Sequence, residues 1–329
     1  MRRISVVSDI DECQDIWRKA MPQEFLSDLW DVRGAFHRHY NHRPHFVVCH
    51  DGGEICGLLP LAFNEETGSL QYFPGETWHG KTWLEQNRII AGDRYIMKRL
   101  LARAGDSYNI RYVRQSGNLL GNSPVVDEVG YFFLPPKYDF DMQKYFEEFS
   151  HKTAKRLKRE LIEWESRGVS YRYDDMADFE TLVAMSLQSY GEDSYFFDPR
   201  FLRSFRSLLG LLKARGWLRI TTVLVEGRPA AIDMGSTYNG TYTLLAGGTN
   251  QEFRGIAKLI NIHHMSWSCE KRFDRVDFLC GDFNWKPQFH LTPQPLYLLA
   301  NDVRAEVAIE TVDSLSWKTA TAGASVRSM

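Results

Sequence analysis

The sequence lacks any long apolar run. Nowhere among its 329 residues do about 18 uncharged apolar residues follow one another, the length that a membrane-spanning helix needs. Its opening residues, MRRISVVSDIDECQDIW, contain no apolar core long enough for a signal peptide. We therefore expect a soluble, cytoplasmic protein without a membrane span.

Cysteine is scarce and the net charge is small. The five cysteines are odd in number and lie mostly in apolar stretches, so we interpret them as reduced core residues and not as a disulfide framework. The 40 Lys and Arg residues nearly balance the 42 Asp and Glu residues, which leaves a formal net charge of −2. That charge provides no overall attraction to nucleic acid or to an anionic membrane.

Several motifs of known chemistry are missing as well. The chain has no Walker motif, no Rossmann glycine fingerprint and no G-x-S-x-G nucleophile elbow. The segment HRHYNHRPH contains His37, His39, His42 and His45, but their spacing is uneven and they have no cysteine partner. We therefore predict no metal site.

The elements that are present predict two α/β units. The length corresponds to roughly two domains of about 100–200 residues each. A helix over residues 11–32, a three-stranded meander, a helix over 95–104 and a strand follow one another, and this order recurs after Asp141. We expect tandem units, each a mostly antiparallel mixed sheet flanked by helices, although such an order also arises by chance. The expected boundaries are residues 1–140, residues 141–315 and a flexible tail at 316–329.

Residues 216–286 carry the most informative pattern. Three strand-like runs are joined by Glu226-Gly227 and Asn239-Gly240, pairs that are typical of tight hairpin turns. After Gly247-Gly248, the segment QEFRGIAKLINIHHMSWSCEKR is predicted to be a helix whose apolar face contains the core histidine His263. A meander that leads into a glycine-led helix N-terminus favours anion binding, because unpaired N–H groups and the helix dipole point toward the anion.

Four segments carry a resemblance to a known family: KTAKRLKRELIEWESRG, EGRPAAIDMG, YNGTYTLLAGGTNQEFRG and DFLCGDFNWK. The order of elements resembles the core of the acyl-CoA N-acyltransferases of the GNAT superfamily. More narrowly, residues 150–286 are similar to the CelD-like acetyltransferases, relatives of the FemAB-type peptidyltransferases. This resemblance implies a GNAT-like fold in both halves, an acetyl-CoA or other acyl-CoA donor, and a role in the biosynthesis of polysaccharide or cell envelope.

The resemblance places the pyrophosphate of coenzyme A on the loop and helix that follow the central strand. The expected ligands are the residues Asn250, Arg254, Gly255, Ala257 and Lys258. The chain departs from the family here, because Ala257 and Leu259 stand where the phosphate loop has Gly and Gly or Ala. Backbone N–H groups still provide an anion site, and FemAB relatives also lack the full loop.

The candidate catalytic residues follow from what amine acylation requires: a base for the amine and positive charge for the oxyanion. Asp282 and Lys286 are four residues apart after a buried strand, so Asp282 could accept the proton while Lys286 neutralises negative charge. We expect Lys286 to serve the reaction and not the fold; the alternative is a surface ion pair. Asp233 lies alone on the apolar strand AAIDMGS and is either catalytic or hydrogen-bonded in the core.

A basic helix at the start of the C-terminal unit indicates which binding partners to expect. Its first turns hold the charges Lys152, Lys155, Arg156, Lys158 and Arg159. Positive charge is disfavoured at a helix N-terminus unless a polyanion approaches it, although a solvated helix face has the same pattern. We expect an N-acyltransferase that acylates a small-molecule amine or a nucleotide-sugar acceptor. The alternatives are a FemAB-like transferase that uses aminoacyl-tRNA and a non-catalytic scaffold.

Overall fold

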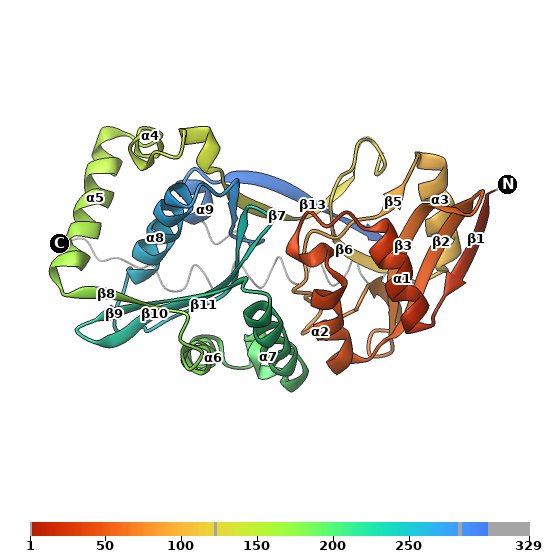
Figure 1. Cartoon of the computed structure of the whole chain (residues 1–329), viewed down its shortest axis with the longest axis horizontal. Helices are drawn as coiled ribbons and strands as arrows, with labels where there is room; N and C mark the ends of the chain where they lie inside the picture. The colour runs from red at the N-terminus through yellow and green to blue at the C-terminus, as the bar shows by residue number, and fades with distance from the viewer. Residues whose placement is uncertain (1, 122–123, 282–284, 302–329) are drawn as a thin grey trace.

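The computed structural model describes residues 2–121, 124–281 and 285–301. Two β-sheets lie side by side along the long axis of the molecule, each flanked by helices (Figure 1). The tandem mixed α/β arrangement expected from the repeated order of elements is confirmed. Among the described residues, no helix is both long and apolar enough to cross a bilayer.

The N-terminal sheet is an antiparallel meander. Its order is β1-β2-β3-β4, with β5 paired to β3. The strands are β1 (Arg3–Val7), β2 (Arg43–Asp51), β3 (Glu54–Asn64), β4 (Ser69–Tyr72) and β5 (Ile90–Ala91). The helix α3 (Arg94–Ala104) packs its buried Ile96, Met97 and Leu100 against this sheet, as its apolar spacing predicts.

The larger sheet has the order β6-β13-β7-β12-β11-β10-β9-β8. Its strands are β6 (Asn109–Val113), β7 (Val125–Phe133), β8 (Val169–Tyr173), β9 (Leu218–Val225), β10 (Arg228–Tyr238), β11 (Thr241–Thr249), β12 (Arg275–Asp277) and β13 (Thr292–Ala300). β8 to β11 form an antiparallel meander, and β12 is parallel to β11. The two predicted hairpin turns are present, with positive φ at Glu226, Gly227, Asn239 and Gly240.

Helices cover both faces of the larger sheet. They are α4 (Met142–Phe146), α5 (His151–Ser166), α6 (Asp178–Tyr190), α7 (Pro199–Ala214), α8 (Ile256–Glu270) and α9 (Trp285–Gln288). α6 and α7 bury one face, where Ile220, Ile232, Met234 and Leu245 join their core. α8 covers the opposite face, against Val223 and Tyr242 among others (Figure 1).

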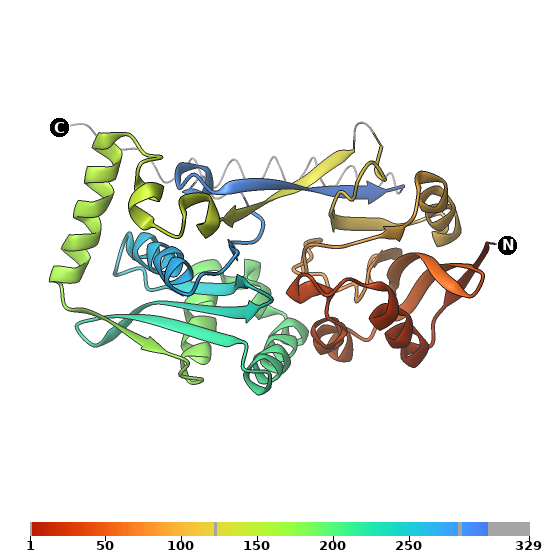
Figure 2. The same cartoon turned by 45° about the horizontal axis from the view of Figure 1, so that its top comes forward.

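The two halves are joined by a strand and by a helix pair. β13 pairs with β7 over one part of its length and with β6 over another, and Figure 2 shows it running from the C-terminal half toward the N-terminal half. α2 (Trp30–Tyr40) packs on α7, where Phe36 meets Phe205 and Asp31 pairs with Arg215 at 2.8 Å. Since β6 and β7 precede residue 140 yet lie in the larger sheet, the boundary at 140/141 stays a proposal. The expected tail at 316–329 lies outside the described residues.

Two predicted helices differ from those observed. The helix expected over 11–32 is divided into α1 (Ile10–Ala20), a 3-10 turn at Leu26–Asp28 and α2. Met21 has an extended backbone before Pro22, because proline disfavours a helical conformation in the residue that precedes it. The helix expected from Gln251 begins only at Ile256, since Gly255 has a left-handed conformation with φ of 88°.

Candidate functional site

The site begins where two parallel strands separate. β11 and β12 pair only from Thr241 to Thr243, opposite Arg275 to Asp277, while β11 continues to Thr249. The register between β10 and β11 passes over Leu245, which is therefore the extra residue of a β-bulge beside the opening.

A small pocket lies at this opening, between the two halves. It is lined by Phe25, Leu26, Ser27, Val32, Trp83, Leu84, Glu85, Gln86, Thr243, Leu245, Asp277 and Leu279. Aromatic and aliphatic side chains form most of this lining, and a few polar groups interrupt them. A largely apolar pocket with convergent polar groups is the usual form of a small-molecule site.

Two buried carboxylates line this pocket. Glu85 is 9% exposed, and both of its oxygens accept from the backbone N–H of Cys280, at 2.9 Å. Burial and the neighbouring charge of Asp277 raise the pKa of the Glu85 carboxyl to about 8. Asp277 is 2% exposed, and burial raises its pKa to about 6. A carboxyl with a pKa in this range can take a proton from an ammonium group near neutral pH.

Lys286 lies beneath the same turn. Its Nζ donates to three backbone carbonyls, those of Phe278 at 2.9 Å, Leu279 at 2.8 Å and Cys280 at 2.7 Å. Lys286 is only 2% exposed; burial lowers its pKa, while the charge of Glu85 opposes that shift. Lys286 therefore holds the turn whose Cys280 N–H donates to Glu85, and in this way it contributes to the fold. Its part in the reaction stays a prediction. Asp282 lies outside the described residues.

Asp233 is paired in the core of the C-terminal half. Its Oδ2 lies 2.9 Å from Nε2 of His264, and both side chains are buried. Gly247 on the neighbouring strand leaves room for this pair, because a Cβ there would lie 2.4 Å from Oδ1 of Asp233. His264, and not His263, is thus the core histidine of α8; the partly exposed His263 stacks on Tyr171 at 4.1 Å.

The expected phosphate-binding residues lie together at the N-terminus of α8. Asn250 accepts from the N–H of Glu252 at 3.0 Å and shapes the turn that enters the helix. Arg254, Gly255, Ala257 and Lys258 are exposed, and among the described residues no side chain caps the helix. Lys258 pairs with Glu160 of α5 at 2.7 Å, which leaves Arg254 as the more accessible cation. This geometry suits an anion, and its occupant stays a prediction.

The basic turns of α5 are largely exposed. Ser150 caps the helix by accepting from the N–H of Thr153, and Leu157 buries the apolar face. Arg156 and Arg159 pair with the acidic residues four positions later, at 3.8 and 3.4 Å.

No group of three or more His, Cys, Asp or Glu side chains in the described ranges could hold a metal ion.

Sequence reasoning missed Glu85 and Asp277. Asp277 lies between Val276 and Phe278 on a buried strand, the same pattern of an isolated carboxylate that singled out Asp233. Glu85 follows Trp83 and Leu84 in a segment without helix or strand, so only its apolar neighbours could have drawn attention to it. Their proximity depends on contacts between the two halves, which no local pattern reveals.

Comparison with known proteins supports the GNAT assignment. Residues 151–287 match the family described as "Acetyltransferase (GNAT) domain". No curated protein matches the chain.

Three solved structures share its fold at low sequence identity. FemX is 10% identical with a TM-score of 0.57, covering 94% of this chain and 99% of its own. A conserved protein of unknown function from Bacteroides thetaiotaomicron is 13% identical with a TM-score of 0.58, over 91% and 99% of the two chains. L-PGS from Bacillus licheniformis is 12% identical with a TM-score of 0.54, over 87% and 96%.

Proposed function

We propose that this protein is an N-acyltransferase that transfers an acyl group from acyl-CoA to an amine in the pocket between its halves. The observation that carries the proposal is the opening between β11 and β12 beside the buried carboxylate of Glu85. The GNAT-type domain supports acyl transfer as the reaction class. The acyl-CoA donor, the amine acceptor and the residue roles below are our proposal.

In the proposed reaction, Glu85 removes a proton from the ammonium form of the acceptor. The free amine attacks the thioester carbonyl carbon, the carbon–sulfur bond breaks, and coenzyme A leaves as a thiolate. The thiolate takes up the second proton, which the nitrogen loses as the amide forms. A backbone N–H at the Leu245 bulge, outside the regular β-ladder, stabilises the developing oxyanion. Lys286 keeps the turn after β12 in place for this step.

The donor's phosphates are proposed to bind at the N-terminus of α8. Arg254 and the uncapped helix end supply positive charge there, at the end of the strand that borders the opening. The acceptor is proposed to be an amine on a sugar or on a precursor of polysaccharide or cell envelope, which the CelD-like resemblance favours. Asp282 is retained as a second candidate base, and Asp233 as a candidate catalytic carboxylate.

A second candidate is transfer from an aminoacyl-tRNA. The exposed basic turns of α5 favour it, because a polyanion would compensate charges such as Lys152 and Lys155. The resemblance to FemAB-type proteins points to the same donor. A non-catalytic scaffold is the third candidate, and the experiment below separates all three.

The test uses the full chain, calorimetry and a turnover assay. We expect acetyl-CoA to bind, and thiol release to require an amine from a panel of amino sugars, amino acids and nucleotide sugars. Glu85→Gln and Asp282→Asn are compared with Glu54→Gln, a matched change at an exposed position on β3. Transfer from aminoacyl-tRNA without acyl-CoA binding would favour the second candidate. A folded protein that binds neither donor would favour the third candidate, the non-catalytic scaffold.

A further inference from the structure

Three arginines gather around one phenylalanine at the edge of the pocket. The guanidinium carbons of Arg88, Arg114 and Arg275 lie 5.3, 4.2 and 4.9 Å from the ring centroid of Phe25. Arg88 precedes β5, Arg114 follows β6, and Arg275 begins β12, so both halves contribute. We call these three residues the arginine cluster.

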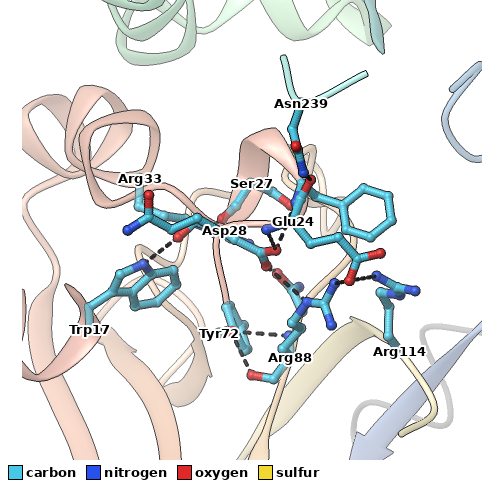
Figure 3. Close-up of polar contacts among 12 residues, drawn as sticks. Trp17, Glu24, Ser27, Asp28, Arg33, Tyr72, Arg88, Arg114 and Asn239 are labelled. Carbon is cyan, nitrogen blue, oxygen red and sulfur yellow. Dashed lines mark hydrogen bonds and ion pairs between the residues drawn. The ribbon is translucent and has the colours of Figure 1, made fainter. Parts of the chain in front are cut away.

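The arginine cluster has fewer direct ion-pair partners than guanidinium groups. The nearby carboxylates are Glu24 and Asp28, and Arg88 contacts both, at 2.5 and 3.1 Å. Arg114 and Arg275 approach Glu24 only at 3.8 Å. Figure 3 shows Arg88 and Arg114 directed toward the carboxylate of Glu24. Three guanidinium groups therefore pair directly with two carboxylates, and the charges of Arg114 and Arg275 also act on Asp277.

Arg114 is the least satisfied member of the cluster. Its Nε and Nη1 are buried and make no hydrogen bond within the described part of the chain. Burial and the charge of Arg88 lower its pKa, which reflects the unfavourable position of its charge. Buried guanidinium groups are normally hydrogen-bonded, so these donors are available to an anionic ligand.

The arginine cluster adjoins the proposed catalytic carboxylates. Arg275 lies two residues before Asp277 on β12 and therefore on the same face of that strand. Arg88 follows Glu85 by three residues, and Phe25 lines the pocket. The segments 85–88 and 275–277 thus each contribute one carboxylate and one arginine to the pocket and its edge.

Glu24 is the exposed carboxylate beside the arginine cluster. Its side chain is 41% exposed, although it lies next to three cations. The backbone around it is held by the other half: Tyr238 donates to the carbonyl of Gln23 at 3.0 Å, and Asn239 to that of Glu24 at 3.2 Å. Rotation of the Glu24 side chain alone would open the guanidinium groups to another anion.

We propose that the arginine cluster binds an anionic group, a carboxylate or a phosphate, on the acceptor amine, and that Glu24 occupies its place until the acceptor binds. This inference rests on the proposed acyl transfer and defines the acceptor as an amine that also carries a negative charge. The acceptor's nitrogen lies toward Glu85 and Asp277, and its anionic group lies against Arg114.

The test compares matched acceptors and variants of the full chain. Glucosamine 6-phosphate is paired with glucosamine, and 4-aminobutyrate with butylamine, so the two pairs distinguish phosphate from carboxylate. We expect one anionic member to have a kcat/KM at least tenfold above its neutral partner. Arg114→Gln should abolish this preference, Arg114→Lys should retain part of it, and Glu24→Gln should lower KM for the anionic acceptor. Arg103→Gln, an exposed change on α3, should have no effect.

A binding measurement separates this inference from the proposed function. Inorganic phosphate and acetate are titrated in a thermal-shift assay of the wild type, Arg114→Gln and Glu24→Gln. A stabilisation that Arg114→Gln removes and Glu24→Gln increases would support the anion site even if no acyl transfer is detected. Turnover without preference for anionic amines would overturn the inference and leave the proposed function intact. Absence of both anion stabilisation and anionic preference also overturns it.

Discussion

Both carboxylate oxygens of Glu85 accept from the backbone N–H of Cys280, at 2.9 Å, although the two residues are 195 positions apart. The contact fastens the segment before β5 to the turn after β12, and Lys286 supports that turn through its three carbonyl contacts. The proposed base is therefore held by the C-terminal half while its chain belongs to the N-terminal half. The proton affinity of Glu85 therefore depends on the packing of the two halves against each other.

Glu85→Gln tests the proposed base. Glutamine keeps a carbonyl oxygen for the N–H of Cys280 but cannot accept a proton, so we expect the melting temperature to be retained. Transfer should fall by roughly 10²-fold or more, the usual effect of losing a general base. The measurement is kcat/KM from thiol release, with Glu54→Gln as the matched control. Unchanged transfer would mean that another group removes the proton from the amine, and Asp282 would be the next candidate.

The raised pKa of Glu85 also predicts how transfer and stability vary with pH. Transfer should increase as pH rises toward and through about 8, because the base acts in its deprotonated form. Stability should change in the opposite direction. Between the ordinary pKa of 4.5 and the folded pKa of about 8, the folded protein retains a proton that the unfolded chain releases, so stability falls as pH rises. Melting curves of the wild type and Glu85→Gln across this window give the measurement, and the variant should show the flatter dependence.

Much of the fold could be predicted because its patterns are local. The Asn239-Gly240 turn, the meander that it closes and the helix after Gly248 all follow from short-range sequence preferences. Pro22, at which the first predicted helix is divided, is a local signal of the same kind. The pairing of β6 with β13 could not be read in this way, because it joins residues about 190 positions apart.

The site was less predictable for a physical reason. Lys286 could be singled out by its place after a buried strand, but its three carbonyl partners depend on the path of the turn. Glu85 acquires its raised pKa from burial and from Asp277, which is contributed by the other half of the chain. A carboxylate is identified as a base by its surroundings, and those surroundings are formed only by folding.

Arg254→Ala tests the donor site at the N-terminus of α8. Arg254 is exposed and lies beside an uncapped helix end, so its loss should weaken coenzyme A binding by roughly 1.5–3 kcal/mol if it makes a charge-assisted hydrogen bond. Calorimetry with coenzyme A provides the measurement, and Arg38→Ala, an exposed change on α2, provides the control. Equal affinity in a folded Arg254→Ala protein would exclude this residue as a ligand.

Asp233→Ala separates a catalytic from a structural carboxylate. The change leaves Nε2 of His264 buried without its partner, so we expect a loss of about 1–3 kcal/mol in the free energy of unfolding. Transfer per folded molecule should stay near that of the wild type, because the Asp233–His264 pair does not line the pocket. Denaturant titration and a turnover assay well below the melting temperature give the two quantities. A large loss of transfer at full folding would favour the catalytic role instead.

Lys286→Met tests whether one buried ammonium serves both the fold and the reaction. Methionine keeps much of the apolar stem but leaves the carbonyls of Phe278, Leu279 and Cys280 without their shared donor. Hydrogen bonds to charged groups contribute roughly 1.5–3 kcal/mol each, so we expect unfolding to become easier by at least about 2 kcal/mol. Transfer should fall by roughly 10²-fold even where the variant is fully folded, because the turn that holds Glu85 is displaced. Lys271→Met, an exposed change at the end of α8, is the control. If the melting temperature is unchanged and transfer is lost, Lys286 serves the reaction alone. If the protein is destabilised and transfer is complete, Lys286 serves the fold alone.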